Sequence, residues 1–249
     1  MTDDQLLRYS RHILLDEVGI DGQERISGAH VVVIGAGGLG SPVALYLGSS
    51  GVGRLTLVDH DTVDLTNLQR QIAHTVERLG VPKVESASSA VAAINPEVHV
   101  TALQQRADDT LLDVLLPRCD LVIDCCDNFA TRQLVNAACV KHGKPLVSGA
   151  AIRFDGQISV YDSRNADSPC YACVFPPDTT FEETRCATLG VFAPVVGIVG
   201  TIQAAEALKL LAGIGRSLAG RLLMLDGRTM EWSEVRVPRN PHCTVCAAR

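Results

Sequence analysis

The chain has 249 residues, 47% hydrophobic and 20% charged, which is enough to bury the core of one large α/β domain. Its net charge of −6 at pH 7 argues against a general basic surface for nucleic acid or anionic membranes, so a protein or small-molecule partner is expected. The sequence predicts no apolar run long enough for a transmembrane helix and its N-terminus opens acidic, so we expect no membrane contact and a cytoplasmic location.

The first 150 residues predict helices alternating with apolar strands. Residues 3–18 carry apolar side chains at helical spacing, which predicts one amphipathic helix before the sheet. Strands are expected at 31–34, 54–58, 98–103, 121–124 and 145–148, with helices beginning near Gly38, Pro82, Asp108 and Asn128. This order predicts a Rossmann-like α/β fold, with a mostly parallel sheet covered by helices on both faces.

The pattern changes after residue 150. Residues 156–161 and 221–226 alternate like antiparallel strands, residues 191–212 predict a long helix, and residues 176–188 predict a mobile loop. We expect a single domain with an N-terminal helical arm (1–28), a nucleotide-binding part (29–150) and a C-terminal antiparallel extension (151–249).

A glycine-rich turn follows the first apolar strand. Its glycines are Gly35, Gly37, Gly38 and Gly40. Such a turn lets backbone come close to phosphate at the positive end of the next helix. Asp59, at the end of the second strand, is placed to accept a hydrogen bond from a ribose hydroxyl. The turn predicts nucleotide binding, with a merely tight turn as the alternative, and does not choose between NAD and ATP.

Polar residues beyond the second strand favour ATP. Asn67, Arg70 and Lys83 could hold a triphosphate and neutralise departing pyrophosphate, although their spacing alone equally allows a solvated surface. Asp127 follows the strand at 121–124 and could hold magnesium through the phosphates. It could equally cap the helix that begins near Asn128.

The nine cysteines are expected to be thiols, ligands or nucleophiles and not a disulfide framework. Two CxxC pairs, Cys170 with Cys173 and Cys243 with Cys246, could supply four thiolates to a structural zinc ion, or be unrelated because the gap between them is long. Four others are expected to be buried small hydrophobes: Cys119, Cys125, Cys126 and Cys139. Trp232 and Tyr161 are expected to pack in the C-terminal strands.

Taken together, these motifs resemble the ThiF and MoeB group of adenylating enzymes, which is related to the ubiquitin-activating enzymes. The resemblance runs through Arg8-Tyr-Ser-Arg11, the glycine turn, Asp59-His-Asp61, Asn67-Leu-Gln-Arg70-Gln71, Pro82-Lys83, Asp124-Cys-Cys-Asp127-Asn128, Gly149-Ala-Ala and both CxxC pairs. It implies ATP-dependent adenylation of the C-terminal glycine of a ubiquitin-like sulfur-carrier protein, of ThiS or MoaD type. Pyrophosphate is released, and the activated carrier accepts sulfur for thiamine or molybdenum-cofactor synthesis.

The resemblance also implies roles for single residues. It assigns ATP binding to Gly35, Gly37, Gly38, Gly40, Asp59, Asp61, Asn67, Gln69, Arg70, Lys83, Asp127 and Asn128. It assigns magnesium binding to Asp127 and zinc binding to the four paired cysteines. Arg11 would reach the ATP site of a neighbouring subunit, which implies a homodimer, and Cys186 occupies the position of a cysteine that bonds to the carrier in ThiF-like members. A cysteine desulfurase or sulfurtransferase would deliver the sulfur.

Three alternatives stay open at this point. An NAD-linked oxidoreductase would use the same glycine turn but leaves Arg70, Lys83 and the paired cysteines unexplained. A non-catalytic carrier-binding protein would not need those cations. A relative acting on transfer RNA fits the acidic charge poorly.

Overall fold

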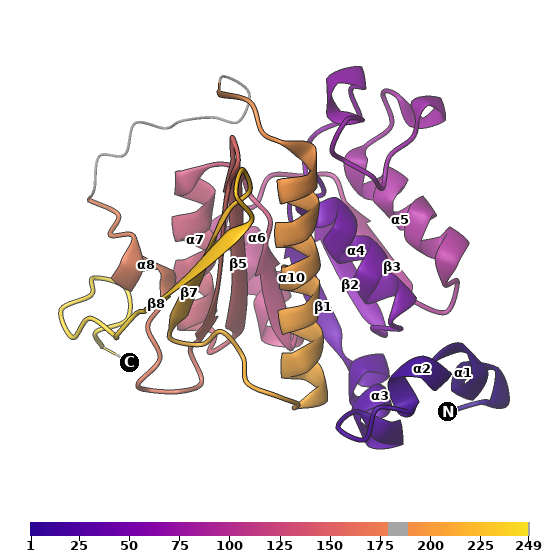
Figure 1. Ribbon diagram of the computed structural model, residues 1–249, viewed down its shortest axis with the longest axis horizontal. Coiled ribbons are helices and arrows are strands. Elements are labelled where there is room, and N and C mark those ends of the chain that lie inside the picture. The colour runs from indigo at the N-terminus through magenta and orange to yellow at the C-terminus, as the bar shows by residue number, and fades with distance from the viewer. Residues whose placement is uncertain (179–188, 249) are drawn as a thin grey trace.

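In the computed structural model of the protein, residues 1–178 and 189–248 are described, and their strands form one eight-stranded sheet in the order β3-β2-β1-β4-β5-β6-β7-β8 (Figure 1). The parallel strands are β1 (His30–Ile34), β2 (Arg54–Val58), β3 (His99–Leu103), β4 (Leu121–Asp124) and β5 (Pro145–Ile152). The antiparallel part is β6 (Asp155–Asp162), β7 (Arg221–Asp226) and β8 (Glu231–Arg236). The predicted fold class and its antiparallel extension are confirmed.

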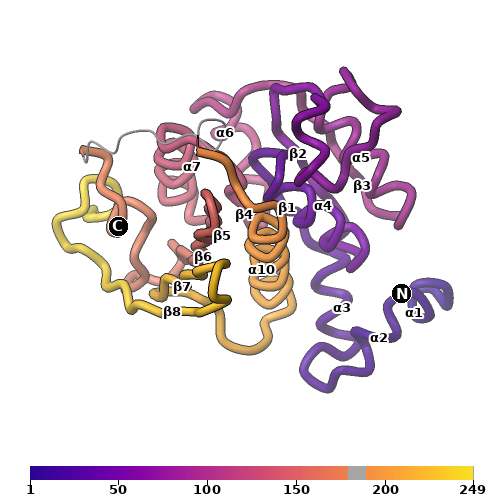
Figure 2. Tube along the Cα trace, turned by 45° about the horizontal axis from the view of Figure 1, so that its top comes forward, coloured from indigo at the N-terminus to yellow at the C-terminus, as the bar shows by residue number. Residues whose placement is uncertain are grey.

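Helices cover both faces of the parallel strands because successive side chains of a strand point to opposite sides. Val31 and Val33 of β1 join a core with α4 (Gly40–Ser49), α5 (Lys83–Ile94) and α10 (Ala193–Ala212). Val32 and Ile34 join a second core with α6 (Asp109–Leu115) and α7 (Phe129–Lys141). Figure 2 shows α10 on the opposite side of the sheet from α6 and α7.

The N-terminal arm differs from the single helix predicted over residues 3–18. It contains α1 (Asp3–Arg8) and α2 (Ser10–Ile13), and α3 (Gly19–Gly28) follows. Tyr9 separates the first two helices, and only 6% of it is exposed. Its hydroxyl accepts a hydrogen bond from the amide of Asn95 (2.9 Å), and its ring lies against Gly51. The break therefore follows from a tertiary contact that the local pattern does not contain.

The helix α10 is long and apolar enough to cross a membrane, so the sequence-based statement that no such stretch exists is wrong on length and composition. Half of that stretch is nevertheless buried inside the protein, where α10 packs on α4 and on β5 and β6. Pro194 lies in its first turn, and Gly213 ends it in the left-handed conformation (φ 70°). The packing is that of a core helix.

Short elements complete the described chain. They are the 3-10 helices at Leu65–Asn67, Val76–Arg78 and Leu116–Arg118, and the helical turn α8 (Tyr171–Val174). The sequence analysis gave no range for the edge strand β8, although it expected Trp232 to lie in a C-terminal strand, and all residues of β8 are exposed. Trp232 on β8 is 42% exposed, so the expectation that it packs is wrong, whereas Tyr161 is buried edge-on against Tyr171. Most of the predicted loop at 176–188 lies outside the described residues.

Candidate active site

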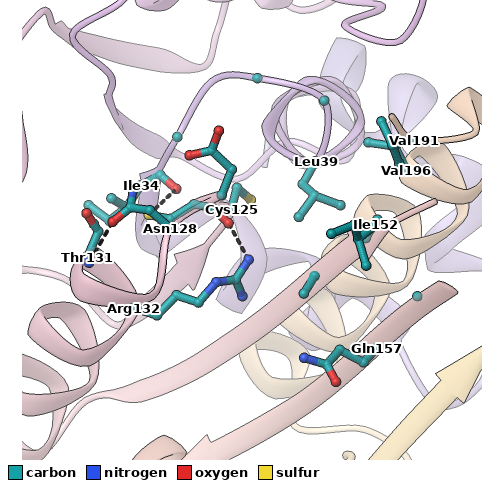
Figure 3. A pocket seen from close by; sticks show the side chains of 18 of the residues that line it. Ile34, Leu39, Cys125, Asn128, Thr131, Arg132, Ile152, Gln157, Val191 and Val196 are labelled. Carbon is teal, nitrogen blue, oxygen red and sulfur yellow. Dashed lines mark hydrogen bonds between the residues drawn. The ribbon is translucent and has the colours of Figure 1, made fainter. Parts of the chain in front are cut away.

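A pocket of about 870 Å³ lies at the carboxyl ends of the parallel strands and continues along β6 and β7 (Figure 3). Ligands of open α/β sheets bind at this edge. The pocket is lined by many of the predicted site residues, namely Gly35, Gly37, Gly38, Asp59, Asp61, Arg70, Lys83, Asp127 and Asn128. Its volume is in the upper range of small-molecule sites, which leaves room for a nucleotide and part of a second substrate.

The glycine turn is packed too tightly for side chains. Gly35 has φ +98°, and a Cβ there would lie 2.8 Å from the carbonyl oxygen of Cys125. A Cβ on Gly38 would lie 2.6 Å from Val196 of α10. Gly40 is not on the pocket: its Cβ would lie 2.0 Å from the Gly35 oxygen, so this glycine permits close packing within the turn. The backbone of Gly35, Gly37 and Gly38 is what faces the pocket.

Asp59 ties the glycine turn to the end of β2. Its Oδ2 accepts the backbone N–H of Ala36 (2.8 Å), and its Oδ1 accepts the backbone N–H of Asp61 (2.9 Å). A carboxylate oxygen can accept more than one hydrogen bond, so a ribose hydroxyl can still bind to Asp59. The predicted position of this acceptor agrees with the geometry.

Lys83, the first residue of α5, brings a buried ammonium group to the pocket. Its Nζ lies 2.9 Å from Asp61 Oδ2, and Asp61 Oδ1 lies 3.1 Å from the Nε2 of His60. Partial burial raises the pKa of Asp61, but its hydrogen bond to Lys83, with the charges of Lys83, His60 and Arg106, lowers that pKa below its ordinary value. Asp61 therefore holds the ammonium group of Lys83 in place at the pocket.

Three predicted ATP-binding residues, Asn67, Gln69 and Arg70, lie on the segment between β2 and α5, and only one of them lines the pocket. Arg70 lines it, with its Nη1 donating to the Thr66 carbonyl (3.1 Å). Asn67 does not, because its side chain closes the cap of a 3-10 helix by accepting the N–H of Asp64. Gln69 is exposed and also lies off the pocket. ATP contacts by Asn67 and Gln69 stay predictions.

Asp127 follows β4 with its carboxylate exposed on the pocket. The alternative that it caps α7 is wrong: Asn128 is the N-cap, and its Oδ1 accepts the N–H of Thr131 at 2.9 Å (Figure 3). Within residues 1–178 and 189–248, no hydrogen bond or ion pair engages the Asp127 carboxylate. It is therefore free to bind a cation.

Arg132 and Gln71 also line the pocket, although the sequence analysis did not predict them as site residues. Arg132, one turn into α7, is buried and donates to the carbonyl oxygens of Cys126 and Gly149, which holds the loop before Asp127. A cation one turn after an acidic strand end is a signal that could have found it. Gln71 is 4% exposed and faces Gly37, and its Oε1 has no partner among the described residues.

One side of the pocket is more apolar. Figure 3 shows Leu39, Ile152, Val191 and Val196 gathered on one side, with Asn128, Thr131 and Arg132 on the other. This apolar side lies between α10 and the hairpin of β5 and β6. The polar part at the glycine turn suits phosphates, whereas the apolar part suits an uncharged chain segment.

A model of the ThiF family matches residues 9–245. The chain belongs to the ThiF family. It is 45% identical over 248 residues to the molybdopterin-synthase adenylyltransferase of Escherichia coli, covering 99% of this chain and 98% of that one. It is 45% identical over 246 residues to the sulfur carrier protein ThiS adenylyltransferase of the same organism, covering 99% and 97%.

The fold of this ThiF-family chain is also found in solved structures. E. coli MccB with ATP superposes with a TM-score of 0.84 at 24% identity, over 96% of this chain and 74% of MccB. The family expected from the motifs is thus confirmed. Relatives named as adenylyltransferases also favour adenylation over the oxidoreductase alternative.

The paired cysteines of this ThiF-family chain come together although they are far apart in sequence. All four sulfurs lie within 4.8 Å of one another, with Cys170 to Cys243 at 3.7 Å and Cys173 to Cys246 at 3.5 Å. Thiolates around a tetrahedral zinc ion, with Zn–S near 2.3 Å, are about 3.8 Å apart. The alternative of two unrelated pairs is therefore wrong, and the geometry fits zinc.

The four remaining described cysteines are buried, as predicted. Burial raises the pKa of Cys119 to about 11 and that of Cys125 well above its ordinary value, so these thiols are unreactive. Cys186 lies outside the described residues. Arg11 is exposed on α2 in the arm that precedes the amino end of β1, so it does not line the pocket of its own chain.

Proposed function

We propose that this protein uses ATP to adenylate the C-terminal carboxylate of a ubiquitin-like sulfur-carrier protein of ThiS or MoaD type. A carboxylate oxygen of the carrier attacks the α-phosphorus of ATP, the bond from that phosphorus to the β-phosphate oxygen breaks, and pyrophosphate leaves. The observation that carries the proposal is one pocket in which a glycine turn, Lys83, Arg70 and Asp127 lie beside a group of apolar side chains. An oxidoreductase with the same glycine turn has no need of Lys83, Arg70 and Asp127 beside it.

Charge is the main obstacle to this reaction, because a carboxylate and a triphosphate repel each other. Lys83 and Arg70 bring positive charge to the pocket, and the exposed carboxylate of Asp127 would hold magnesium. When bound, the metal ion would neutralise phosphate charge and orient the departing pyrophosphate. Catalysis would come largely from this electrostatic stabilisation and from positioning of the two substrates.

The apolar part of the pocket suits the tail of the carrier. It is bounded by the end of β5, the start of β6 and the first turn of α10, with Ile152, Val191 and Val196 exposed to it. An extended peptide can be held there by its backbone, and terminal glycines would let it lie close to the pocket wall. The two E. coli relatives are named for a molybdopterin synthase and for ThiS, so either carrier type is a candidate.

A second copy of the chain would complete the site. The arm exposes Leu7, Leu14 and Leu15, and the segment before α5 exposes Leu65 and Ile72. We infer that a second subunit covers these side chains in a homodimer, where Arg11 of one subunit would reach the pocket of its neighbour.

The four paired cysteines would hold a structural zinc ion, since four thiolates leave no open position for water. The ion would join α8 to the C-terminal segment. Cys186 would be available for a covalent link to the carrier, and a cysteine desulfurase or sulfurtransferase would supply sulfur. We expect these steps to take place in the cytoplasm.

ATP–pyrophosphate exchange tests the proposal directly. Purified protein with magnesium is given a ThiS-type carrier, a MoaD-type carrier, or each carrier without its terminal glycine. Exchange that requires the intact tail is the expected result, and the active carrier identifies the pathway. No exchange with either carrier, from a folded and zinc-loaded protein, would favour the non-catalytic carrier-binding alternative.

A further inference from the structure

His74 lies buried behind the glycine turn, outside the motifs quoted above and outside the pocket lining. It is 6% exposed. Its Nε2 lies 2.9 Å from the carbonyl oxygen of Ala36, and its Nδ1 lies 2.9 Å from the hydroxyl of Ser86. The imidazole therefore bridges the glycine turn and α5, the helix that begins at Lys83.

The partners of the ring fix its tautomer. A carbonyl oxygen only accepts, so the proton must be on Nε2, and Nδ1 then accepts the hydroxyl proton of Ser86. Burial lowers the pKa of His74, and the charges of Lys83 and Arg78 lower it further, against the opposing effects of Ala36 and Asp59. The ring is thus a neutral donor toward the turn.

The hydrogen bond to Ala36 fixes the next peptide unit. In a trans peptide the C=O and the following N–H point in opposite directions, and no cis bond occurs in the described chain. With the Ala36 oxygen held toward His74, the N–H of Gly37 points away from the imidazole. Gly37 lines the pocket, and its N–H has no hydrogen-bond partner among the described residues.

We propose that His74 is a positioning residue that presents the Gly37 N–H to a phosphate of the nucleotide. Asp59 holds the N–H of Ala36 and His74 holds its carbonyl oxygen, so both peptide units around Ala36 are fixed before a ligand arrives. Ser86 links this arrangement to the helix of Lys83. The inference rests on the proposed use of ATP and deepens it.

Two substitutions separate positioning from packing. The side-chain nitrogen of glutamine is as many bonds from Cα as the histidine Nε2, whereas that of asparagine matches only Nδ1. His74→Gln can therefore still donate to Ala36, and His74→Asn cannot. Titration calorimetry with ATP and with adenosine compares each variant with the wild-type protein, because adenosine lacks the phosphates.

We expect His74→Asn to weaken ATP binding about tenfold and His74→Gln to weaken it no more than about twofold, with adenosine binding unchanged in both. Equal ATP affinity in the asparagine variant and wild type, or an equal loss for ATP and adenosine, would overturn the inference. Failure of the wild-type protein to bind ATP would instead overturn the proposed function.

A second measurement needs no substitution of His74 itself. Long-range ¹H–¹⁵N spectra of wild-type protein with ¹⁵N-labelled histidine report which ring nitrogen of each histidine carries the proton. The signals of His74 are assigned as those that shift in the Ser86→Ala variant, because Ser86 contacts that ring. One of the seven histidines should be the neutral Nε2–H tautomer and should respond to Ser86→Ala. An Nδ1–H tautomer at the responding ring contradicts the proposed hydrogen bonds.

Discussion

The ammonium group of Lys83 lies 2.9 Å from a carboxylate oxygen of Asp61, although only 8% of the lysine side chain is exposed and half of the aspartate is. The pair stands beside the glycine turn on the pocket wall. A nucleotide phosphate that approaches Lys83 therefore meets a cation that is already desolvated and oriented. Preorganisation of this kind lets charge be stabilised without reorganising solvent.

Asp61→Asn should reduce stability in a pH-dependent way. The folded-state pKa of Asp61 is lowered from 3.8, so its contribution is complete above that value and is lost as pH falls through the lower folded pKa. The difference in unfolding free energy between wild type and variant should be about 1 kcal/mol near pH 7 and should narrow below pH 3.8. Urea denaturation across this range measures it, with Asp16→Asn on the exposed arm as control. A difference that grows on acidification contradicts the assignment.

Asp127→Ala should lower the rate of ATP–pyrophosphate exchange at least about 100-fold, because the site loses its free carboxylate for magnesium. The melting temperature should stay unchanged, since Asp127 is exposed and does not cap α7. Asn128→Ala is the matched control: loss of the cap costs about 1 kcal/mol of stability. Near-wild-type exchange in folded Asp127→Ala would remove the metal role.

Arg11→Ala should be rescued in mixed dimers with Asp127→Ala. If Arg11 acts in the neighbouring subunit, the mixed dimer keeps one complete site, and an equal mixture should recover about one quarter of wild-type exchange. If it acts within its own chain, both sites are incomplete and no activity returns. Subunit exchange before the assay, with each single variant alone as control, distinguishes these outcomes.

Much of the fold could be predicted because the central parallel strands are buried on both faces. β1 and β4 appear in the sequence as continuous apolar runs, only Thr56 interrupts the apolar run of β2, and the polar residues that follow these strands meet at one edge of the sheet. For this reason the sequence alone places Gly35, Asp59 and Asp127 at one edge of the sheet.

Features that depend on distant contacts could not be predicted. Tyr9 breaks the arm because its hydroxyl binds Asn95, which lies 86 positions further along the chain. β8 exposes every residue, so it has no alternating pattern to read. The side chain of Asn67 is occupied by a local cap, which its spacing from Arg70 does not reveal.

Cys173→Ser should cost zinc and stability together. Its sulfur lies 3.5 Å from that of Cys246, and a serine hydroxyl is a poor substitute for a thiolate ligand. We expect bound zinc, measured by elemental analysis, to fall from about one ion per chain to well below that value, with a lower melting temperature. Cys139→Ala removes a buried thiol outside the cluster, so it should lose stability while keeping its zinc. Unchanged zinc in Cys173→Ser, or equal zinc loss in both variants, would mean that the four sulfurs do not form the metal site.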